Sequence, residues 1–170
     1  IGGVLIFGDG LDVDRARRIE EVLRMVIVKG EERGRDSFGI VALNRDGELS
    51  VFKSREKPSI AVSKIPSIIG EDTVAVIFNN RAEPTTEYVR VKTEDDIQPM
   101  IGEHVVVAHN GTIANDKELE TKFNLTRRSR IDTAILPPLL ERLWDGSLNG
   151  LKDVLVNHVV GSYALAIMDT

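Results

Sequence analysis

The stretch HVVVAHNGTIAND, residues 104–116, joins an apolar run to a polar dipeptide and then to the start of a helix. The apolar run predicts a buried strand, and Asn115 is placed to cap the helix that follows. Between them, Asn110-Gly111 is by itself a common turn dipeptide, because both residues tolerate a positive φ. The pair also places an amide side chain beside an unhindered glycine N–H at the end of a strand, which is the donor arrangement of an oxyanion hole. This stretch alone leaves both interpretations open.

The rest of the chain predicts a mixture of strands and helices. Apolar patterns predict strands at 4–7, 38–43, 49–53, 73–79, 104–109 and 162–169, with a hairpin turn at 44–47. Helices are predicted from an Asp12 or Asp14 cap to about Val28, within 61–70, after Asn115, at 132–144 and at 148–158, and residues 80–103 are predicted to be loop-like. In the first helix the apolar residues recur at helical spacing with charges between them, at Val13, Ala16, Ile19, Leu23 and Val26. Antiparallel hairpins and helices gathered in separate stretches favour one domain of sheets covered by helices.

Composition limits the function classes. The chain has 170 residues, of which 42% are hydrophobic and 29% charged, as in an ordinary globular domain. A net charge of −5 argues against a broad nucleic-acid or anionic-membrane surface, and we interpret the basic residues at 127–130 as solvated. No apolar run approaches the ~18–20 residues that span a bilayer. No targeting segment is recognisable at the start, so we expect a cytoplasmic location.

Cysteine and histidine usage bears on metal chemistry. The sequence contains no cysteine, which excludes disulfides and thiolate metal sites within these residues. The histidines, His104, His109 and His158, do not have the spacing of a zinc site. We therefore expect neither a metal nor a cofactor.

Five segments occur in one order along nearly the whole chain. They are ERGRDSFGIVAL (32–43), NNRAEP (79–84), AHNGTIAND (108–116), SRIDTAI (129–135) and GSYALAIMD (161–169). This ordered set resembles the class II glutamine amidotransferase domain, a branch of the N-terminal-nucleophile hydrolases. The resemblance implies an α+β fold, an αββα sandwich of antiparallel sheets covered by helices. It also implies that residues 1–170 are one such type-2 domain, lacking its first residues and its C-terminal continuation.

The resemblance assigns roles to four residues. Asn110 and Gly111 match the oxyanion-hole pair of the family. Arg81 matches the arginine that binds the α-carboxylate of glutamine, and Asp132 matches the aspartate that receives the α-ammonium group. A planar guanidinium suits bidentate carboxylate binding. A further set matches a signature that packs near the site and is expected to support it: Arg33, Gly34, Asp36, Ser37 and Gly39.

The start of the chain departs from the family pattern. The family nucleophile is an N-terminal cysteine, followed by a small residue, an aliphatic residue, any residue and glycine. Ile1-Gly2-Gly3 fits the third to fifth of these positions, so the nucleophile is expected two residues before Ile1. Either a Met-Cys-X start is missing from these residues, or the domain is a natural pseudoenzyme. In both cases the chain as given is expected to lack glutaminase activity.

A second departure surrounds Arg81. Asn79-Asn80 stands where the family has His-Thr, and Ala82 stands where many members have a large residue. The predicted function is the glutamine-hydrolysing half of an amidotransferase, with glutamine as substrate and an ammonia-accepting synthase domain or subunit as partner. The alternatives are a non-catalytic module that senses glutamine and an interaction domain that retains only the fold.

Overall fold

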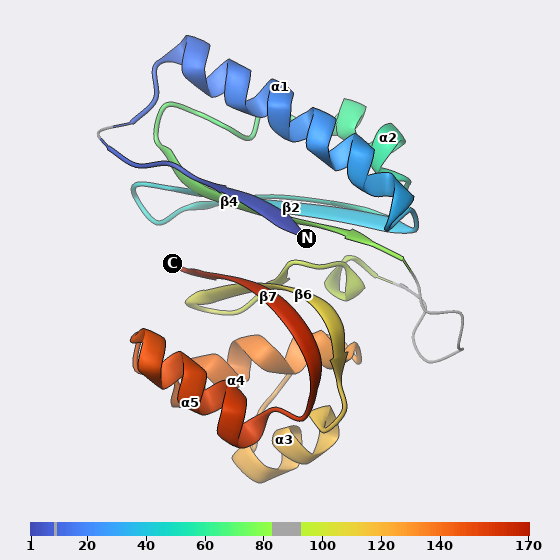
Figure 1. Ribbon diagram of the computed structural model, residues 1–170, viewed down its shortest axis with the longest axis vertical. Helices are drawn as coiled ribbons and strands as arrows, with labels where there is room; N and C mark the ends of the chain where they lie inside the picture. Colours follow the sequence, from blue (N-terminus) through green and yellow to red (C-terminus); the bar gives the residue numbers. More distant parts are fainter. Residues whose placement is uncertain (9, 83–92) are drawn as a thin grey trace. The chain divides into compact units, whose positions relative to one another are not determined.

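The computed structural model describes residues 1–8, 10–82 and 93–170. These residues form two compact units, Ile1–Pro99 and Met100–Thr170. In each unit the helices lie on one face of an antiparallel sheet (Figure 1). The predicted α+β class, with antiparallel sheets covered by helices, is therefore confirmed in both units.

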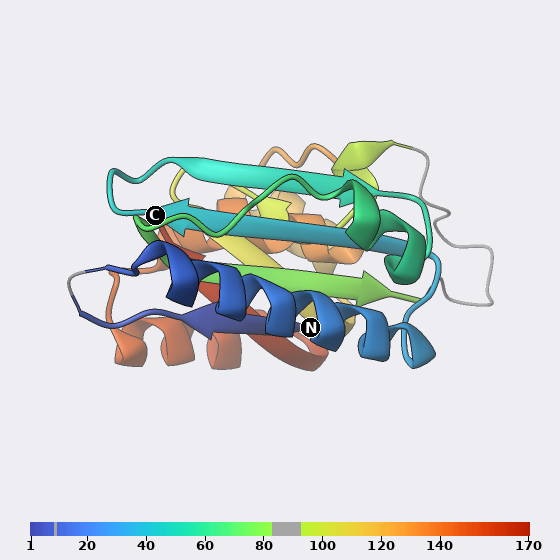
Figure 2. The ribbon, with the colours of Figure 1, turned by 90° about the horizontal axis from the view of Figure 1, so that it is seen from above.

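The first unit contains a four-stranded sheet in the order β1-β4-β2-β3, with α1 over one face (Figure 2). Its elements are β1 (Gly2–Leu5), α1 (Val13–Lys29), β2 (Ser37–Asn44), β3 (Leu49–Ser54), α2 (Pro58–Ala61) and β4 (Thr73–Arg81), with 3-10 turns at Gly30–Glu32, Val62–Lys64 and Glu94–Asp96. Helix α2 begins before the predicted segment, and its 3-10 continuation ends before Pro66. Of the predicted 80–103 loop, the part at 83–92 lies outside the described residues, while β4 includes Asn80 and Arg81.

Helix α1 confirms the predicted helix and buries only part of its apolar pattern. Asp12 is the N-cap, and its carboxylate accepts the Arg15 N–H at 2.8 Å. The buried residues of the helix are Ala16, Leu23 and Ile27, while Val13 and Val26 are exposed. The buried stripe follows residues spaced seven and four apart, which places Val26 to its side, so the apolar pattern of the sequence is wider than the buried stripe.

The hairpin between β2 and β3 forms as predicted. The side-chain oxygen of Asn44 accepts the N–H groups of Asp46 at 3.1 Å and Glu48 at 2.7 Å. Gly47 has a φ of +83°, which glycine adopts without strain. The local sequence is sufficient to specify this turn.

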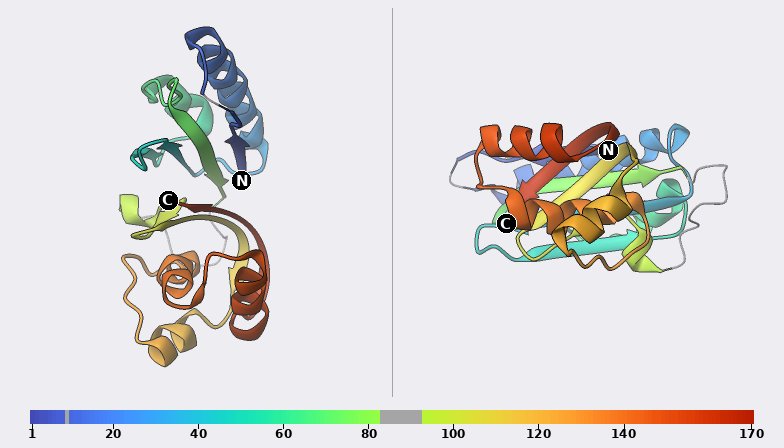
Figure 3. Two further views of the ribbon diagram at one scale, coloured as in Figure 1. Left: turned by 90° about the vertical axis from the view of Figure 1, so that its left-hand side faces the viewer. Right: turned by 90° about the horizontal axis from the view of Figure 1, so that it is seen from below.

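The second unit contains a three-stranded sheet in the order β5-β6-β7, with its helices on one face (Figure 3). Its elements are β5 (Met100–Ile101), β6 (Val105–Ile113), α3 (Asp116–Phe123), a 3-10 turn η4 (Asp132–Ile135), α4 (Leu136–Leu143), α5 (Leu148–His158) and β7 (Gly161–Asp169). The predicted 132–144 helix therefore begins as a 3-10 turn. The helix at 148–158 is confirmed. None of the described helices is long and apolar enough to cross a membrane.

Two local predictions in this unit were wrong. Strand β6 does not end before Asn110 but continues to Ile113, because pairing with β7 holds its last residues in the sheet. Helix α3 starts where expected, but the Asn115 side chain does not cap it. Instead, this amide donates to the His158 carbonyl at 2.8 Å and accepts the Val160 N–H at 2.9 Å.

The basic cluster at 127–130 also differs from the expectation. Arg127 is not solvated: it pairs with Asp116 and with Glu120, the latter at 3.0 Å, and its side chain is 9% exposed. Arg128 and Arg130 are exposed, as predicted. The ion pairs of Arg127 connect the start of α3 to the segment that leads to Asp132.

Candidate active site

Asn110 and Gly111 lie side by side on β6, opposite Ala164 and Tyr163 of β7. Gly111 has a φ of +139°, and a Cβ atom at this position would clash with the carbonyl oxygen of Ser162. Glycine is therefore required both by the backbone conformation and by the space. The Asn110 side chain is exposed, and it makes no hydrogen bond to any residue that the structure describes. Its amide donors are therefore available to a ligand.

Asp132 is anchored to the same strand. One carboxylate oxygen accepts the Ile113 N–H at 2.7 Å, and the other accepts the Thr133 N–H at 2.8 Å. Ile113 lies two residues after Gly111, so these bonds hold the carboxylate at the Asn110-Gly111 end of β6. A carboxylate offers about four lone-pair positions, which leaves acceptor capacity for a cationic ligand.

His109 and Thr133 support this arrangement, although the sequence analysis gave them no chemical role. His109 is buried, and its Nδ1 lies 2.8 Å from the Thr133 hydroxyl oxygen. The same hydroxyl lies 3.3 Å from an Asp132 carboxylate oxygen. Burial lowers the pKa of His109, and the Asp132 charge and the Ser162 backbone oppose this only in part. The sequence could have indicated both residues, because each directly neighbours a predicted site residue.

Arg81 is the last residue of β4, in the first unit, where it pairs with Ser37 of β2. Its Nη1 donates to the Asp96 carbonyl at 3.3 Å, and the residue is half-buried. The structure thus brings Asn110, Gly111 and Asp132 together within one unit, whereas Arg81 belongs to the other.

The family signature within residues 33–39 packs against the end of β4 that carries Arg81. A Cβ atom on Gly34 would clash with the Asn80 carbonyl oxygen, and the Asp36 N–H donates to the Arg81 carbonyl at 2.9 Å. Ser37 is fully buried directly opposite Arg81. These contacts agree with a supporting role for the signature.

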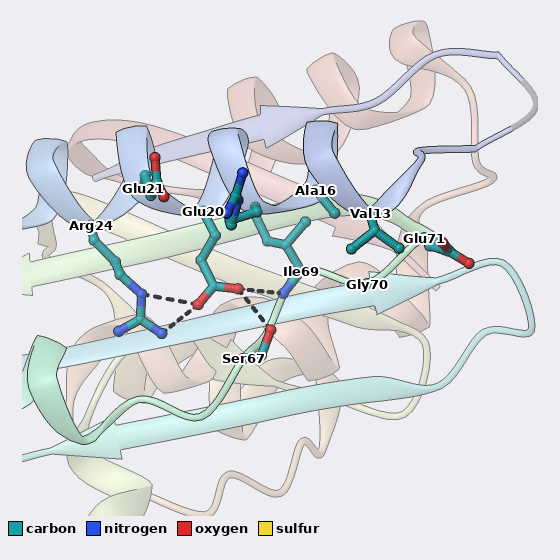
Figure 4. Close-up of a pocket in the computed structure, with 10 residues that line it drawn as sticks. Val13, Ala16, Glu20, Glu21, Arg24, Ser67, Ile69, Gly70 and Glu71 are labelled. Atoms are coloured by element: carbon teal, nitrogen blue, oxygen red, sulfur yellow. Dashed lines mark hydrogen bonds and ion pairs between the residues drawn. The ribbon is translucent and has the colours of Figure 1, made fainter.

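A separate cavity of about 310 Å³ lies on the helix side of the first unit, between α1 and residues 67–71 (Figure 4). The Glu20 carboxylate braces it, accepting from Arg24, from the Ser67 hydroxyl at 3.0 Å and from the Ile69 N–H at 3.3 Å. Burial alone would raise the pKa of Glu20, but these hydrogen bonds and the Arg24 charge lower it. None of the predicted site residues lines this cavity. Within residues 1–8, 10–82 and 93–170, no three histidine or acidic side chains gather as a metal site would require.

A family model described as "Glutamine amidotransferase domain" matches residues 85–170, half of the chain. The chain belongs to the class II glutamine amidotransferase domain family. This confirms the resemblance that the five ordered segments indicated.

Two relatives show how the amidotransferase domain sits within longer proteins. The 7-cyano-7-deazaguanine synthase of Saccharolobus solfataricus is 52% identical over 99% of this chain and 35% of its own length. The isomerizing glutamine–fructose-6-phosphate aminotransferase of Haemophilus influenzae is 28% identical over 91% of this chain and 25% of its own length. The chain spans about a third of the length of the first of these relatives.

Solved structures agree on the fold. The glutamine phosphoribosylpyrophosphate amidotransferase of B. subtilis has a TM-score of 0.65 to this chain at 20% sequence identity, covering 98% of this chain and 34% of that one. At this identity the likeness concerns the fold alone, and it confirms the amidotransferase type of α+β domain.

Proposed function

We propose that this domain hydrolyses glutamine and donates the released ammonia to a synthase. The observation that carries the proposal is the anchoring of Asp132 to the strand of Asn110 and Gly111, by the 2.7 Å bond from the Ile113 N–H. In this proposal Asn110 and Gly111 donate to the oxygen that becomes anionic when the side-chain amide of glutamine is attacked. Each such donor lowers the barrier by roughly 3–4 kcal/mol.

Arg81 and Asp132 are proposed to bind the two charges on the α-carbon of glutamine. The guanidinium of Arg81 suits the carboxylate, and the unused acceptor positions of Asp132 suit the ammonium group. A peptide lacks these two free charges at the residue that is cleaved. The pair would therefore select a free amino acid.

The proposed nucleophile is a cysteine two residues before Ile1. In the β1–β4 register Gly2 lies opposite Phe78 and Gly3 opposite Ile77. The same register, continued backwards, places the second residue before Ile1 opposite Arg81. Residues directly opposite on antiparallel strands have neighbouring side chains on one face. A thiol at that position would attack the amide carbon and release ammonia, and water would then release glutamate from the thioester.

The proposed partner is a synthase that consumes the ammonia. The most similar of the relatives named above is called a 7-cyano-7-deazaguanine synthase. A cyano group contains one nitrogen, and ammonia is a chemically suitable source for it. We propose that a synthase domain or subunit of this kind receives the ammonia.

The cytoplasmic location stays a prediction.

The test is ammonia release by the chain preceded by Met-Cys-X, with the initiator methionine removed so that cysteine is the first residue. We expect ammonia and glutamate in equal amounts from glutamine. The matched control, preceded by Met-Ser-X, is expected to be inactive or nearly so. A Cys form that binds glutamine without releasing ammonia would favour the glutamine-sensing alternative, and a form without binding heat would leave only an interaction domain.

A further inference from the structure

We propose that the buried amide pair of Asn79 and Gln98 positions Arg81 to bind the carboxylate of an amino acid. The inference rests on the proposed function and adds a specificity determinant to it. The Asn79 side chain donates to the side-chain oxygen of Gln98 at 3.0 Å. The two residues are 4% and 5% exposed. Buried amides are uncommon, and a hydrogen bond between them specifies their orientation.

The strand geometry links this pair to Arg81. Residues two apart on a strand point to the same face, so Asn79 and Arg81 share a face of β4. Asn80 points to the other face, where its side chain donates to the Ile27 carbonyl of α1 at 2.8 Å. The Asn79 and Arg81 side chains therefore meet a common neighbour, the segment 93–98.

Segment 93–98 is held at both ends. Near its start, the Asp96 carboxylate accepts the Thr93 N–H at 3.0 Å, which closes the 3-10 turn. At its end, the Gln98 backbone crosses β2 so closely that a Cβ atom on Gly39 would clash with the Gln98 carbonyl oxygen. The Asp96 carbonyl, between these points, accepts from the Arg81 guanidinium at 3.3 Å.

Carboxylate binding by arginine depends on this orientation. A bidentate contact requires the plane of the guanidinium to face the carboxylate, and a guanidinium without restraint loses conformational entropy on binding. The Asn79–Gln98 bond fixes the segment whose carbonyl holds Arg81. Breaking it should weaken binding of ligands that carry a carboxylate and leave other ligands unaffected.

The experiment measures binding by calorimetry to the full 170-residue chain. The ligands are glutamine and 4-aminobutanamide, which is glutamine without its α-carboxylate. In Asn79→Leu, which keeps the branched shape of the side chain and removes its polar atoms, we expect glutamine affinity to fall about tenfold, the size of one hydrogen bond to a charged group. The affinity for 4-aminobutanamide should stay within twofold of the unsubstituted protein.

Asn80→Leu is the matched control, because it removes a hydrogen bond that a side-chain amide donates from the neighbouring residue on the opposite face. It should lower the melting temperature without changing glutamine affinity. Asn79→Gln and Gln98→Asn should each weaken glutamine binding, while the double variant, which conserves the combined side-chain length, should restore it. Unchanged glutamine affinity in Asn79→Leu, or an equal loss for both ligands, would overturn the inference. If the unsubstituted protein binds no glutamine, the proposed function is itself wrong, and this inference fails with it.

Discussion

Arg81 and Asp132 are proposed to bind opposite charges of one ligand, yet their surroundings restrain them in different ways. Asp132 accepts the Ile113 N–H at 2.7 Å, on a strand whose Gly111 tolerates no side chain, and the Thr133 N–H at 2.8 Å within its own 3-10 turn. Arg81 is restrained by a carbonyl at 3.3 Å on a segment that a side-chain pair holds in place. The Asp132 carboxylate is thus held by backbone N–H groups directly, whereas the Arg81 guanidinium is held through a segment that is itself fixed by a side-chain pair.

This difference relates to where the sequence departs from its family. The Asn110-Gly111 segment keeps the family pattern, whereas Asn79, Asn80 and Ala82 around Arg81 depart from it. Gly111 in one region, and Gly34 and Gly39 in the other, each pass a carbonyl oxygen too closely for a Cβ atom. The departures from the family pattern therefore fall on side chains that lie between these fixed positions.

The largest expected effect is on turnover. In the chain preceded by Met-Cys-X, Asn110→Ala should reduce ammonia release about 10²–10³-fold, because one of the proposed oxyanion donors is lost. Initial rates at saturating glutamine measure the effect. Asn157→Ala, an exposed change on α5, is the control and should leave the rate unchanged. Equal rates for Asn110→Ala and its parent would remove Asn110 from the mechanism.

The second prediction tests the close approach of the backbone at Gly111. Gly111→Ala should lower the free energy of unfolding by about 3 kcal/mol, because it combines a positive φ with a steric clash. Gly146 also has a positive φ, +83°, but open space around it, so Gly146→Ala should cost only about 1 kcal/mol. Urea denaturation measures both. Equal losses would show that the carbonyl of Ser162 yields easily.

A smaller effect is expected for glutamine binding. Asp132→Asn should weaken it about 10- to 30-fold, as expected for the loss of one charged partner of the ammonium group. The asparagine oxygen can accept only one of the Ile113 and Thr133 N–H groups, so we also expect a lower melting temperature from the loss of one hydrogen bond. Asp153→Asn makes the same charge change at an exposed site on α5 and serves as the control. An affinity loss shared by both variants would reflect overall charge rather than a specific contact.

The smallest expected effect is a change of the free energy of unfolding with pH. It arises in the second unit, which contains all three histidines. Burial lowers the pKa of His109 in the folded state, so below about pH 6.5 the unfolded chain binds more protons. The stability that comes from keeping His109 neutral is therefore present above pH 6.5 and is lost as the pH falls below that value. Denaturation at pH 7.5 and 5.5 should show a smaller acid loss in His109→Gln than in the parent, while the exposed-site variant His104→Gln should behave like the parent.

Much of the fold could be predicted where neighbouring residues decide it. The Asn44–Gly47 turn and the helix at 148–158 depend on residues close in sequence, and both were predicted correctly. Asp12, one of the two predicted candidates for the cap of α1, is the N-cap. Predictions failed where distant partners decide. Asn115 has the composition of a helix cap, but its amide binds the end of α5 more than forty residues away. Val26 fits a helical apolar pattern, but the orientation of α1 on its sheet leaves it exposed.

The sequence by itself determined which side chains are available and, through five ordered motifs, to which family the domain belongs. Motif residues are short-range features, and their order along the chain does not depend on packing. Only the tertiary structure decided that Asn110 and Gly111 lie within a strand, and that Ile113 and Thr133 hold the Asp132 carboxylate. It also decided that Gln98 lies against Asn79 and Gly39. Apart from the bond between the neighbours Thr133 and Asp132, these contacts join residues far apart in sequence, and their geometry follows from how whole strands and turns pack together.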